Sequence, residues 1–357
     1  MDKYLSDLAR SIVPYTAGEQ PKNNVIKLNT NENPYPPSQH AIAAAANAIK
    51  PALRRYPKTD GGDFRDAAAL VNKVDAKNVF CSNGSDELLA FCFAAFFDPD
   101  KPVKIFDVTY SFYPVWAKFF NIPLDIIPLN SDFSVPVKEM YMSKGGVVFP
   151  NPNAPTGMAI SLNEVEKIVA NNEGKVVIVD EAYVAFGCET AVPLTKKYDN
   201  LLVVRTLSKS HSLAGLRAGY AIGSEYLING LTRIRDSFNS YPTDAISQEM
   251  AAAALKDETY ANMVYQNILE TRKETILALK KLKFNVLPSL ANFVFISHEI
   301  PAKTLLNELK KAGILVRYFN LPRIDNYLRV TIGTGAEMIA FISKLEKILS
   351  SLGYVVD

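Results

Sequence analysis

The stretch NLLVVRTLSKSHSLAGLRAGYAIG, residues 200–223, places two short apolar runs, LLVV and GYAIG, on either side of a polar turn. Apolar runs of this length that are rich in branched aliphatic residues are typical of strands buried on both faces of a sheet. The turn between them brings Lys209 and Arg217 close to the expected core. A buried cation is unfavourable unless an anion or a covalent partner compensates it. We therefore expect this turn to face a ligand.

Similar apolar runs recur upstream, separated by turn signals and helical patterns. They are NVFCS (78–82), VKIFDV (103–108), LDIIPL (124–129), GVVFP (146–150) and KVVIVD (175–180). One of the intervening helices is announced by Ser161 and Glu164, which form a capping-box pattern before an apolar periodic run. The alternation predicts an α/β fold with a large domain, in which helices cover both faces of a mostly parallel, seven-stranded sheet. Ligands of such sheets bind beyond the carboxyl ends of the strands.

A smaller α+β domain is predicted at the C-terminal end. Residues 247–282 contain no proline or glycine, so they predict one long helix leading out of the sheet region. Beyond it, apolar patterns predict strands in FNVLPSLANFVFIS, ILVRYF and YLRVTIG, and helices in AKTLLNELKKAG and 336–352. The predicted organisation is an N-terminal arm (1–30), a large domain (31–262) and a small domain (263–357) that packs with the N-terminal segment.

Composition excludes several classes of protein. The 357 residues are 48% hydrophobic and 21% charged, which is typical of a globular protein with a sizeable core. Lys and Arg total 39 against 37 Asp and Glu, and the basic residues are scattered, which argues against a nucleic-acid surface. The three cysteines lack metal-type spacing, so we expect a reducing cytoplasm and no metal site. No apolar stretch is long enough for export or membrane insertion, so neither is expected.

An anion cradle is predicted in CSNGSDELL, residues 81–89, where a strand ends in a glycine turn and a helix begins. The free N–H groups and the dipole of a helix N-terminus favour an anion near Gly84, Ser85 and Asp86. The alternative, that Ser85 or Asp86 merely caps the helix, stays open at this point.

Two further motifs follow neighbouring strands. In FPNPNAPTG (149–157), prolines stiffen the backbone and would hold the amide of Asn153 toward a ligand, although a plain rigid turn needs only some of these residues. In VVIVDEAYVAF (176–186), Asp180 ends an apolar strand and Tyr183 follows in the turn. A buried acid needs a positive partner, with a helix cap as the structural alternative.

The opening turn and a late strand carry the basic residues. Lys209 can form an imine with an aldehyde, and Thr206, Ser208 and Arg217 could surround a phosphate. A basic loop salt-bridged to its neighbours is the alternative. His211 is expected to be structural, because nothing pairs with it as a base. In YLRVTIG (327–333), an arginine inside an apolar strand favours recognition of a carboxylate, although a structural ion pair remains possible.

Taken in order, the motifs LNTNENPYPP, RRYP, NGSDE, NPNAPTG, DEAY, TLSKSHSLAGLRAGY and YLRVTIGT resemble those of the fold-type I pyridoxal-phosphate-dependent aminotransferases. The resemblance extends from about Asn29 to Thr334. Within the family, the motifs look most like those of members that act on histidinol phosphate. The resemblance is more specific for the cofactor, pyridoxal 5'-phosphate, than for the substrate.

The resemblance implies a role for each motif around the cofactor ring. Lys209 would hold the cofactor aldehyde as an imine and later act as a general base. Asp180 would keep the pyridine nitrogen protonated, and Asn153 and Tyr183 would hydrogen-bond the phenolic oxygen. Tyr110 would stack on the ring.

The resemblance also implies how the cofactor phosphate is bound. Its ligands would be Arg217, Thr206, Ser208 and the Gly84–Asp86 turn, with Tyr56 contributed by a second subunit. The expected assembly is therefore a homodimer with shared active sites.

The substrates implied by the resemblance are a small amino donor and a 2-oxo acid. Arg329 would bind the carboxylate of glutamate or 2-oxoglutarate, and Arg317, Tyr15 and Asn31 would complete the substrate site. Together they predict a ping-pong histidinol-phosphate:2-oxoglutarate transamination. The alternatives are an aromatic amino-acid aminotransferase and a lyase such as threonine-phosphate decarboxylase. A regulatory, non-enzymatic protein would normally carry a DNA-binding segment, and no such pattern is visible.

Overall fold

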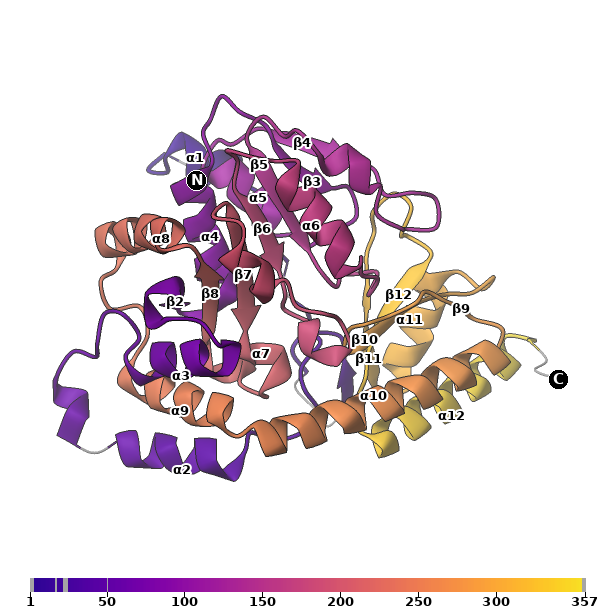
Figure 1. The fold of residues 1–357 in the computed structure, drawn as a ribbon. Helices are drawn as coiled ribbons and strands as arrows, with labels where there is room; N and C mark the ends of the chain where they lie inside the picture. The colour runs from indigo at the N-terminus through magenta and orange to yellow at the C-terminus, as the bar shows by residue number, and fades with distance from the viewer. Residues whose placement is uncertain (1–2, 17, 22–24, 50, 355–357) are drawn as a thin grey trace.

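The computed structural model describes residues 3–16, 18–21, 25–49 and 51–354, which form two sheets surrounded by helices (Figure 1). The strands of the larger sheet are β2 (Val79–Ser82), β3 (Val103–Phe106), β4 (Leu124–Ile127), β5 (Gly146–Pro150), β6 (Val177–Asp180), β7 (Leu201–Thr206) and β8 (Gly219–Gly223). Those of the smaller sheet are β1 (Ile26–Leu28), β9 (Asn285–Val286), β10 (Phe293–Ser297), β11 (Ile314–Tyr318) and β12 (Tyr327–Thr331).

The α-helices alternate with these strands and then close the chain. They are α1 (Asp7–Ser11), α2 (Gln39–Ala48), α3 (Asp63–Asn72), α4 (Gly84–Phe96), α5 (Tyr113–Phe119), α6 (Leu162–Ala170), α7 (Leu207–Ser210), α8 (Glu225–Phe238), α9 (Ala245–Lys256), α10 (Glu258–Lys281), α11 (Ala302–Lys311) and α12 (Gly335–Ser351). The capping box predicted from Ser161 and Glu164 is formed at the start of α6.

The larger sheet has seven strands in the order β2-β8-β7-β6-β5-β3-β4. Each of the seven predicted apolar runs supplies one strand. The pairs from β7 across to β4 are parallel, whereas β8 runs antiparallel to both β7 and β2. The prediction of a mostly parallel, seven-stranded sheet is therefore confirmed.

Both faces of this sheet are covered, as the apolar runs predict. Along β6, Val177 and Val179 pack into a core with α3, α6 and α9, whereas Ile178 points into the opposite core with α4, α5 and α8. All three side chains are fully buried. Because successive side chains of a strand point to opposite faces, only a run that is apolar throughout can fill both cores.

The prediction of a single helix over 247–282 is wrong in one respect. The stretch forms two helices, α9 and α10, separated at Asp257. The Asp257 side chain accepts a hydrogen bond from the backbone N–H of Tyr260 and so caps α10. Aspartate is among the preferred N-cap residues because its carboxylate satisfies an otherwise free N–H. Figure 1 shows α10 running from the seven-stranded sheet to the five-stranded sheet, where it lies beside α12.

The smaller sheet has the order β1-β11-β12-β10-β9. Its pairs are antiparallel except for β1 and β11, which pair in parallel with Ile26 opposite Ile314. The strand β1 lies inside the predicted arm and was not expected from the sequence. The arm otherwise contains the short helix α1, and its residues 1–2, 17 and 22–24 lie outside the described part. The predicted domain limits stay predictions.

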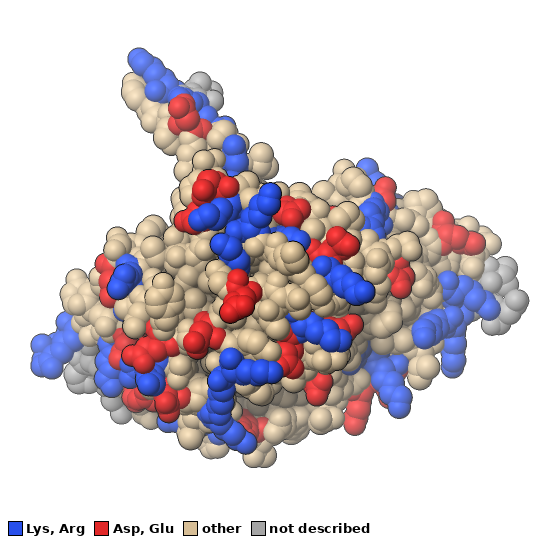
Figure 2. All heavy atoms as spheres, turned by 45° about the horizontal axis from the view of Figure 1, so that its top comes forward, with Lys and Arg blue, Asp and Glu red and all other residues tan. Residues whose placement is uncertain are grey.

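The surface carries charges of both signs. Figure 2 shows Lys and Arg interspersed with Asp and Glu over one face of the molecule. Among the helices of the described residues, none combines the length and the apolar character needed to cross a membrane.

Candidate active site

One cleft takes its walls from the carboxyl ends of β6 and β7, the N-terminus of α4, and the strands β11 and β12 of the smaller sheet. It gathers the predicted site residues Tyr15, Asn31, Ser85, Asp86, Tyr110, Asp180, Tyr183, Thr206, Ser208, Lys209, Arg217, Arg317 and Arg329. The predicted residues Gly84, Asn153 and Tyr56 do not line it. Lys209 and Asp180 thus share a cleft, which is the arrangement that the predicted chemistry requires.

Lys209 is the amine of this cleft. The strand β7 ends at Thr206, whose side chain accepts from the N–H of Ser208 and starts the short helix α7 that carries Lys209. The Nζ atom donates to the backbone oxygen of Thr30 at 2.9 Å. Burial, aided by the positive charge of Arg329, lowers the pKa of Lys209 to about 8. Roughly a tenth of the molecules therefore carry a neutral, nucleophilic amine at pH 7, and about half do at pH 8.

Asp180 provides a buried carboxylate at the end of β6. Its side chain is only 4% exposed, and it accepts from the hydroxyl of Tyr113 and from the N–H of Ala182, each at 3.0 Å. Burial raises the pKa of Asp180 to about 6. In the described part of the chain, no Lys, Arg or His forms a salt bridge with it. A cationic ring nitrogen would supply the missing partner.

The residues of the predicted anion cradle lie together at the start of α4. Gly84 has φ +80°, and a Cβ atom there would lie 2.8 Å from Nη2 of Arg217. The guanidinium of Arg217 also contacts Asp86, with Nη2 3.2 Å from Oδ2. The hydroxyl-bearing Ser85 and Ser208 also line the cleft. Free N–H groups of the first helical turn, two hydroxyls and a guanidinium together suit a phosphate.

Two tyrosines, Tyr110 and Tyr183, line the same cleft. The Tyr110 hydroxyl donates to Oδ1 of Asp86 at 2.8 Å, which links the ring to the first turn of α4. The Tyr183 hydroxyl accepts from Nδ2 of Asn31 at 2.9 Å and keeps its own proton available for donation. The predicted substrate residue Asn31 is thus bound to the Tyr183 side chain.

Two arginines of the smaller sheet form one wall of the cleft. Arg317 and Arg329 lie directly opposite each other in the β11–β12 register. Their Nη2 atoms donate to the backbone oxygens of Thr16 at 3.0 Å and Asn29 at 3.1 Å. The Nε atom of Arg329 is buried without a partner, and neither side chain forms a salt bridge with a residue of the described ranges. Burial lowers the pKa of Arg329. The two guanidiniums therefore face the cleft without a carboxylate of the described residues to neutralise them.

The structure gives Asn153 a different set of contacts from those expected. Its amide NH2 group donates to the oxygen of Val108 at 3.0 Å and to Oγ1 of Thr156 at 3.1 Å, while Oδ1 is buried without a partner. Both amide hydrogens are therefore used within the protein. The predicted donation from Asn153 to a ligand oxygen stays a prediction.

Tyr56 lies away from the cleft of its own chain. It is 79% exposed and stacks on Tyr241 with ring centroids 4.4 Å apart. This position leaves its predicted role dependent on a second subunit. His211, which was expected to be structural, has Nδ1 2.7 Å from Oγ of Ser210, and burial lowers its pKa to about 4.

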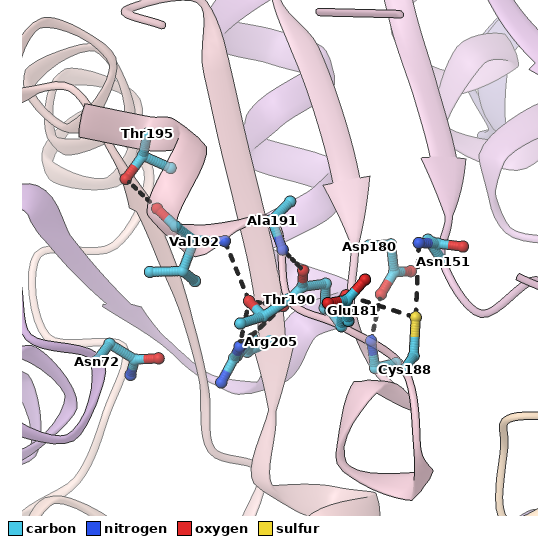
Figure 3. A network of polar contacts seen from close by, with 12 residues as sticks. Asn72, Asn151, Asp180, Glu181, Cys188, Thr190, Ala191, Val192, Thr195 and Arg205 are labelled. Carbon is cyan, nitrogen blue, oxygen red and sulfur yellow. Dashed lines mark hydrogen bonds and ion pairs between the residues drawn. The ribbon is translucent and has the colours of Figure 1, made fainter. Parts of the chain in front are cut away.

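Several residues of the site were missed by the sequence reasoning. Tyr113 and the Thr30 carbonyl, which bind Asp180 and Lys209, carry no signal that distinguishes them from their neighbours. Glu181 and Arg205 form a buried ion pair of 2.9 Å behind the cleft, and Figure 3 shows them joined through Thr190. The sequence did carry a signal for this pair. Glu181 is next to Asp180 and Arg205 is next to Thr206, and because successive side chains of a strand alternate between the two faces, both should point away from the cleft on adjacent strands.

The sequence is similar to a known protein family and to relatives over nearly its whole length. The sequence profile of a family described as "Aminotransferase class I and II" matches residues 23–345. A histidinol-phosphate aminotransferase of Clostridium botulinum (strain 657 / Type Ba4) is 48% identical over 99% of this chain and 100% of its own length. Histidinol-phosphate aminotransferase 1 of Bordetella parapertussis is 49% identical over 98% and 100%.

A crystal structure provides a comparison of the fold. The histidinol-phosphate aminotransferase of Sinorhizobium meliloti, in complex with pyridoxal-5'-phosphate, superposes with a TM-score of 0.85, 21% identity and 98% coverage of each chain. At this identity the likeness shows the shared fold.

Proposed function

The chain belongs to the class I and II aminotransferase family, and we propose that it uses pyridoxal phosphate to transfer an amino group from histidinol phosphate to 2-oxoglutarate. The observation that carries the proposal is that one cleft holds a buried amine of lowered pKa, Lys209, and two guanidiniums without acids, Arg317 and Arg329. The relatives in Clostridium botulinum and Bordetella parapertussis, named for this reaction, support the choice of substrate.

The residues of the cleft suit each part of the cofactor. The start of α4, with Ser85, Ser208 and Arg217, would bind the phosphate. Because Gly84 has no side chain, the guanidinium of Arg217 can lie close to the N-terminus of α4. Asp180 would pair with the ring nitrogen. Tyr183 would donate to the phenolic oxygen. When bound, the cofactor supplies an electron sink that stabilises negative charge at the α carbon of the substrate.

Lys209 would carry the proton chemistry. Its amine is neutral in a large fraction of molecules near pH 8, so it can take a proton from the α carbon of the substrate. The Thr30 carbonyl holds the amine at a fixed place in the cleft. When a cationic ring nitrogen lies beside Asp180, the carboxylate would stay ionised. The positive charge lowers the pKa of Asp180 and so offsets the rise caused by burial.

The arginine wall would select the substrates. Histidinol phosphate has a phosphate and no carboxylate, whereas 2-oxoglutarate has carboxylates and no phosphate. Arg317 and Arg329 lie opposite each other without acids, so they can bind either group through charge-assisted hydrogen bonds. An aromatic amino-acid aminotransferase would instead be expected to have an apolar slot in place of a second anion site.

The test is a comparison of histidinol phosphate with phenylalanine as donors to 2-oxoglutarate, using purified holoenzyme. We expect kcat/KM for histidinol phosphate to exceed that for phenylalanine by about 100-fold or more. Arg317→Gln should raise the KM for histidinol phosphate by about 10- to 100-fold, and it should also raise the KM for 2-oxoglutarate because the same arginine pair would bind a carboxylate. Preference for phenylalanine would favour an aromatic aminotransferase, and release of carbon dioxide from an amino-acid phosphate would favour a decarboxylase.

Assembly and location stay predictions. The exposed Tyr56 is compatible with the predicted homodimer, because only a second copy could bring this side chain to a cofactor. The protein is predicted to be cytoplasmic.

A further inference from the structure

The arginine wall of the cleft lies on one face of the smaller sheet. The strand registers place Phe295 of β10 beside Arg329 of β12, and Arg329 beside Arg317 of β11. Like charges directly opposite on neighbouring strands repel each other. No acid of the described residues pairs with either arginine, and the backbone oxygens of Thr16 and Asn29 each bind only one of the two guanidiniums.

Phe319 contacts both of them. Its ring centroid lies 5.5 Å from the guanidinium carbon of Arg317 and 5.5 Å from that of Arg329. Both distances are within the range of a cation–π interaction, in which the negative face of the ring attracts the cation. Phe319 follows Arg317 by two residues, the spacing of side chains on the same face of an extended chain. Phe295 supports the ring from the side, with centroids 6.3 Å apart.

We propose that Phe319 is a positioning residue, whose ring holds the guanidiniums of Arg317 and Arg329 side by side for a single anionic group of the substrate. This inference rests on the proposed function, because it concerns how that site binds phosphate and carboxylate groups.

An aromatic ring has an advantage over an acid in this position. A carboxylate would fix the guanidiniums by hydrogen bonds, but it would occupy the donors that the substrate needs and cancel their charge. A ring interacts with the face of each guanidinium and leaves the N–H groups in its plane free. Arg329 contacts two rings in this way, since the ring centroid of Phe293 lies 5.3 Å from the same guanidinium carbon.

The test compares Phe319→Leu with Phe319→Tyr in the holoenzyme. Leucine keeps an apolar side chain and removes the ring face, whereas tyrosine keeps the face. For Phe319→Leu, we expect the KM for histidinol phosphate and the inhibition constant of inorganic phosphate to rise about 3- to 30-fold, with kcat within about twofold. For Phe319→Tyr, both constants should stay within about twofold of the parent. Unchanged constants in Phe319→Leu, or a fall in kcat alone, would overturn the proposal.

A matched control separates positioning from general loosening of the sheet. Phe133 also lies under an arginine, with its centroid 5.3 Å from Arg323, but Arg323 pairs with Asp107 and does not line the cleft. Phe133→Leu should leave the inhibition constant of phosphate unchanged. An equal rise in this variant would overturn the positioning role.

A double-variant cycle covers the case in which Phe319→Leu folds poorly. The inhibition constant of inorganic phosphate is compared between Phe319→Tyr and Phe319→Met, first with Arg317 present and then in an Arg317→Gln background. The difference between the two Phe319 variants should be much smaller in the Arg317→Gln background. Equal differences in the two backgrounds would refute the coupling. If the parent enzyme binds inorganic phosphate but does not use histidinol phosphate, the proposed substrate fails while the role of Phe319 can still be measured.

Discussion

The hydroxyl of Tyr113 donates a hydrogen bond to Oδ2 of Asp180 at 3.0 Å, at a place where Tyr113 is wholly buried and Asp180 is 4% exposed. Burial alone favours the neutral acid, whereas a hydrogen bond to the carboxylate favours the charged form. The pKa of Asp180 is raised to about 6, with burial as the largest cause and the Tyr113 hydrogen bond acting against it. Asp180 is therefore mostly ionised at pH 7.

Tyr113→Phe should raise the pKa of Asp180 further, because it removes a donor to the carboxylate. Since the ionised form is needed to pair with a ring nitrogen, the affinity of the apo-protein for pyridoxal phosphate should fall at low pH with a midpoint near 6. In the variant, this midpoint should move up by about one unit. Fluorescence titrations at several pH values measure it. Tyr220→Phe, another buried tyrosine whose hydroxyl binds Asn72, should leave the midpoint in place.

Asp180→Asn should stabilise the apo-protein while abolishing useful catalysis. The folded pKa of Asp180, about 6, lies above its value in an unfolded chain, so folding is favoured by protonation and stability is lost as pH rises toward 6. A neutral asparagine avoids this loss. We expect the free energy of unfolding at pH 7 to rise by about 1 to 3 kcal/mol, measured by denaturant titration. At pH 4 the difference should largely vanish, and a constant difference would contradict this explanation.

Capture of the cofactor by Lys209 should depend on pH with a midpoint near 8. Only the neutral amine attacks an aldehyde, and burial lowers the pKa of Lys209 to about 8. The rate of appearance of the visible absorbance band after mixing apo-protein with pyridoxal phosphate measures this. Arg329→Met should move the midpoint upward, because the charge of Arg329 contributes to the lowered pKa. Lys209→Ala should give no such band and should lose turnover by orders of magnitude.

Gly84→Ala should weaken cofactor binding more than an alanine at another glycine of similar positive φ would. The added Cβ would meet Arg217 at 2.8 Å and push the guanidinium away from the cradle, and the φ of +80° is also strained for alanine. Gly174→Ala is the matched control, since Gly174 has φ +72° but open space around its Cβ position. Both variants should lose about 1 kcal/mol of stability. Only Gly84→Ala should raise the Kd for pyridoxal phosphate, by about tenfold.

Arg205→Met should be severely destabilising. Its partner Glu181 has a side chain that is only 1% exposed, so the variant leaves a buried carboxylate without its cation. Removal of one member of such a pair costs about 3 to 5 kcal/mol. Thermal unfolding of the single variant and of Glu181→Leu/Arg205→Met measures this. The double variant should recover most of the loss, and a double variant as unstable as the single one would show that the charge is not the cause.

The larger sheet was predictable because its strands are apolar throughout, which is the local consequence of burial on both faces. β1 was not, because three residues near the N-terminus acquire their strand character only by pairing with β11, far along the chain. The break at Asp257 was missed for a related reason. An aspartate inside a helical pattern reads as an ordinary exposed position, and only its bond to the N–H of Tyr260 identifies it as a cap.

The candidate site was predictable where its residues follow strands, because parallel strands bring their carboxyl ends to one edge. Lys209, Asp180 and Ser85 were found in this way. Tyr113 could not be found, since its contact with Asp180 depends on how α5 packs against β6 in the folded chain. The contacts of Asn153 were also out of reach, because the competing acceptors Val108 and Thr156 become neighbours only in the folded chain.

The resting partner of the Lys209 amine is a main-chain oxygen, that of residue 30, and this has a consequence for protein engineering. Every amino acid supplies the same oxygen, so a library that randomises the threonine side chain should retain the contact in any clone that preserves the local path of the chain. That path depends on Asn31, which has φ +54° and receives support from Thr331. Tolerance to randomisation should therefore be high at position 30 and low at the position that follows it.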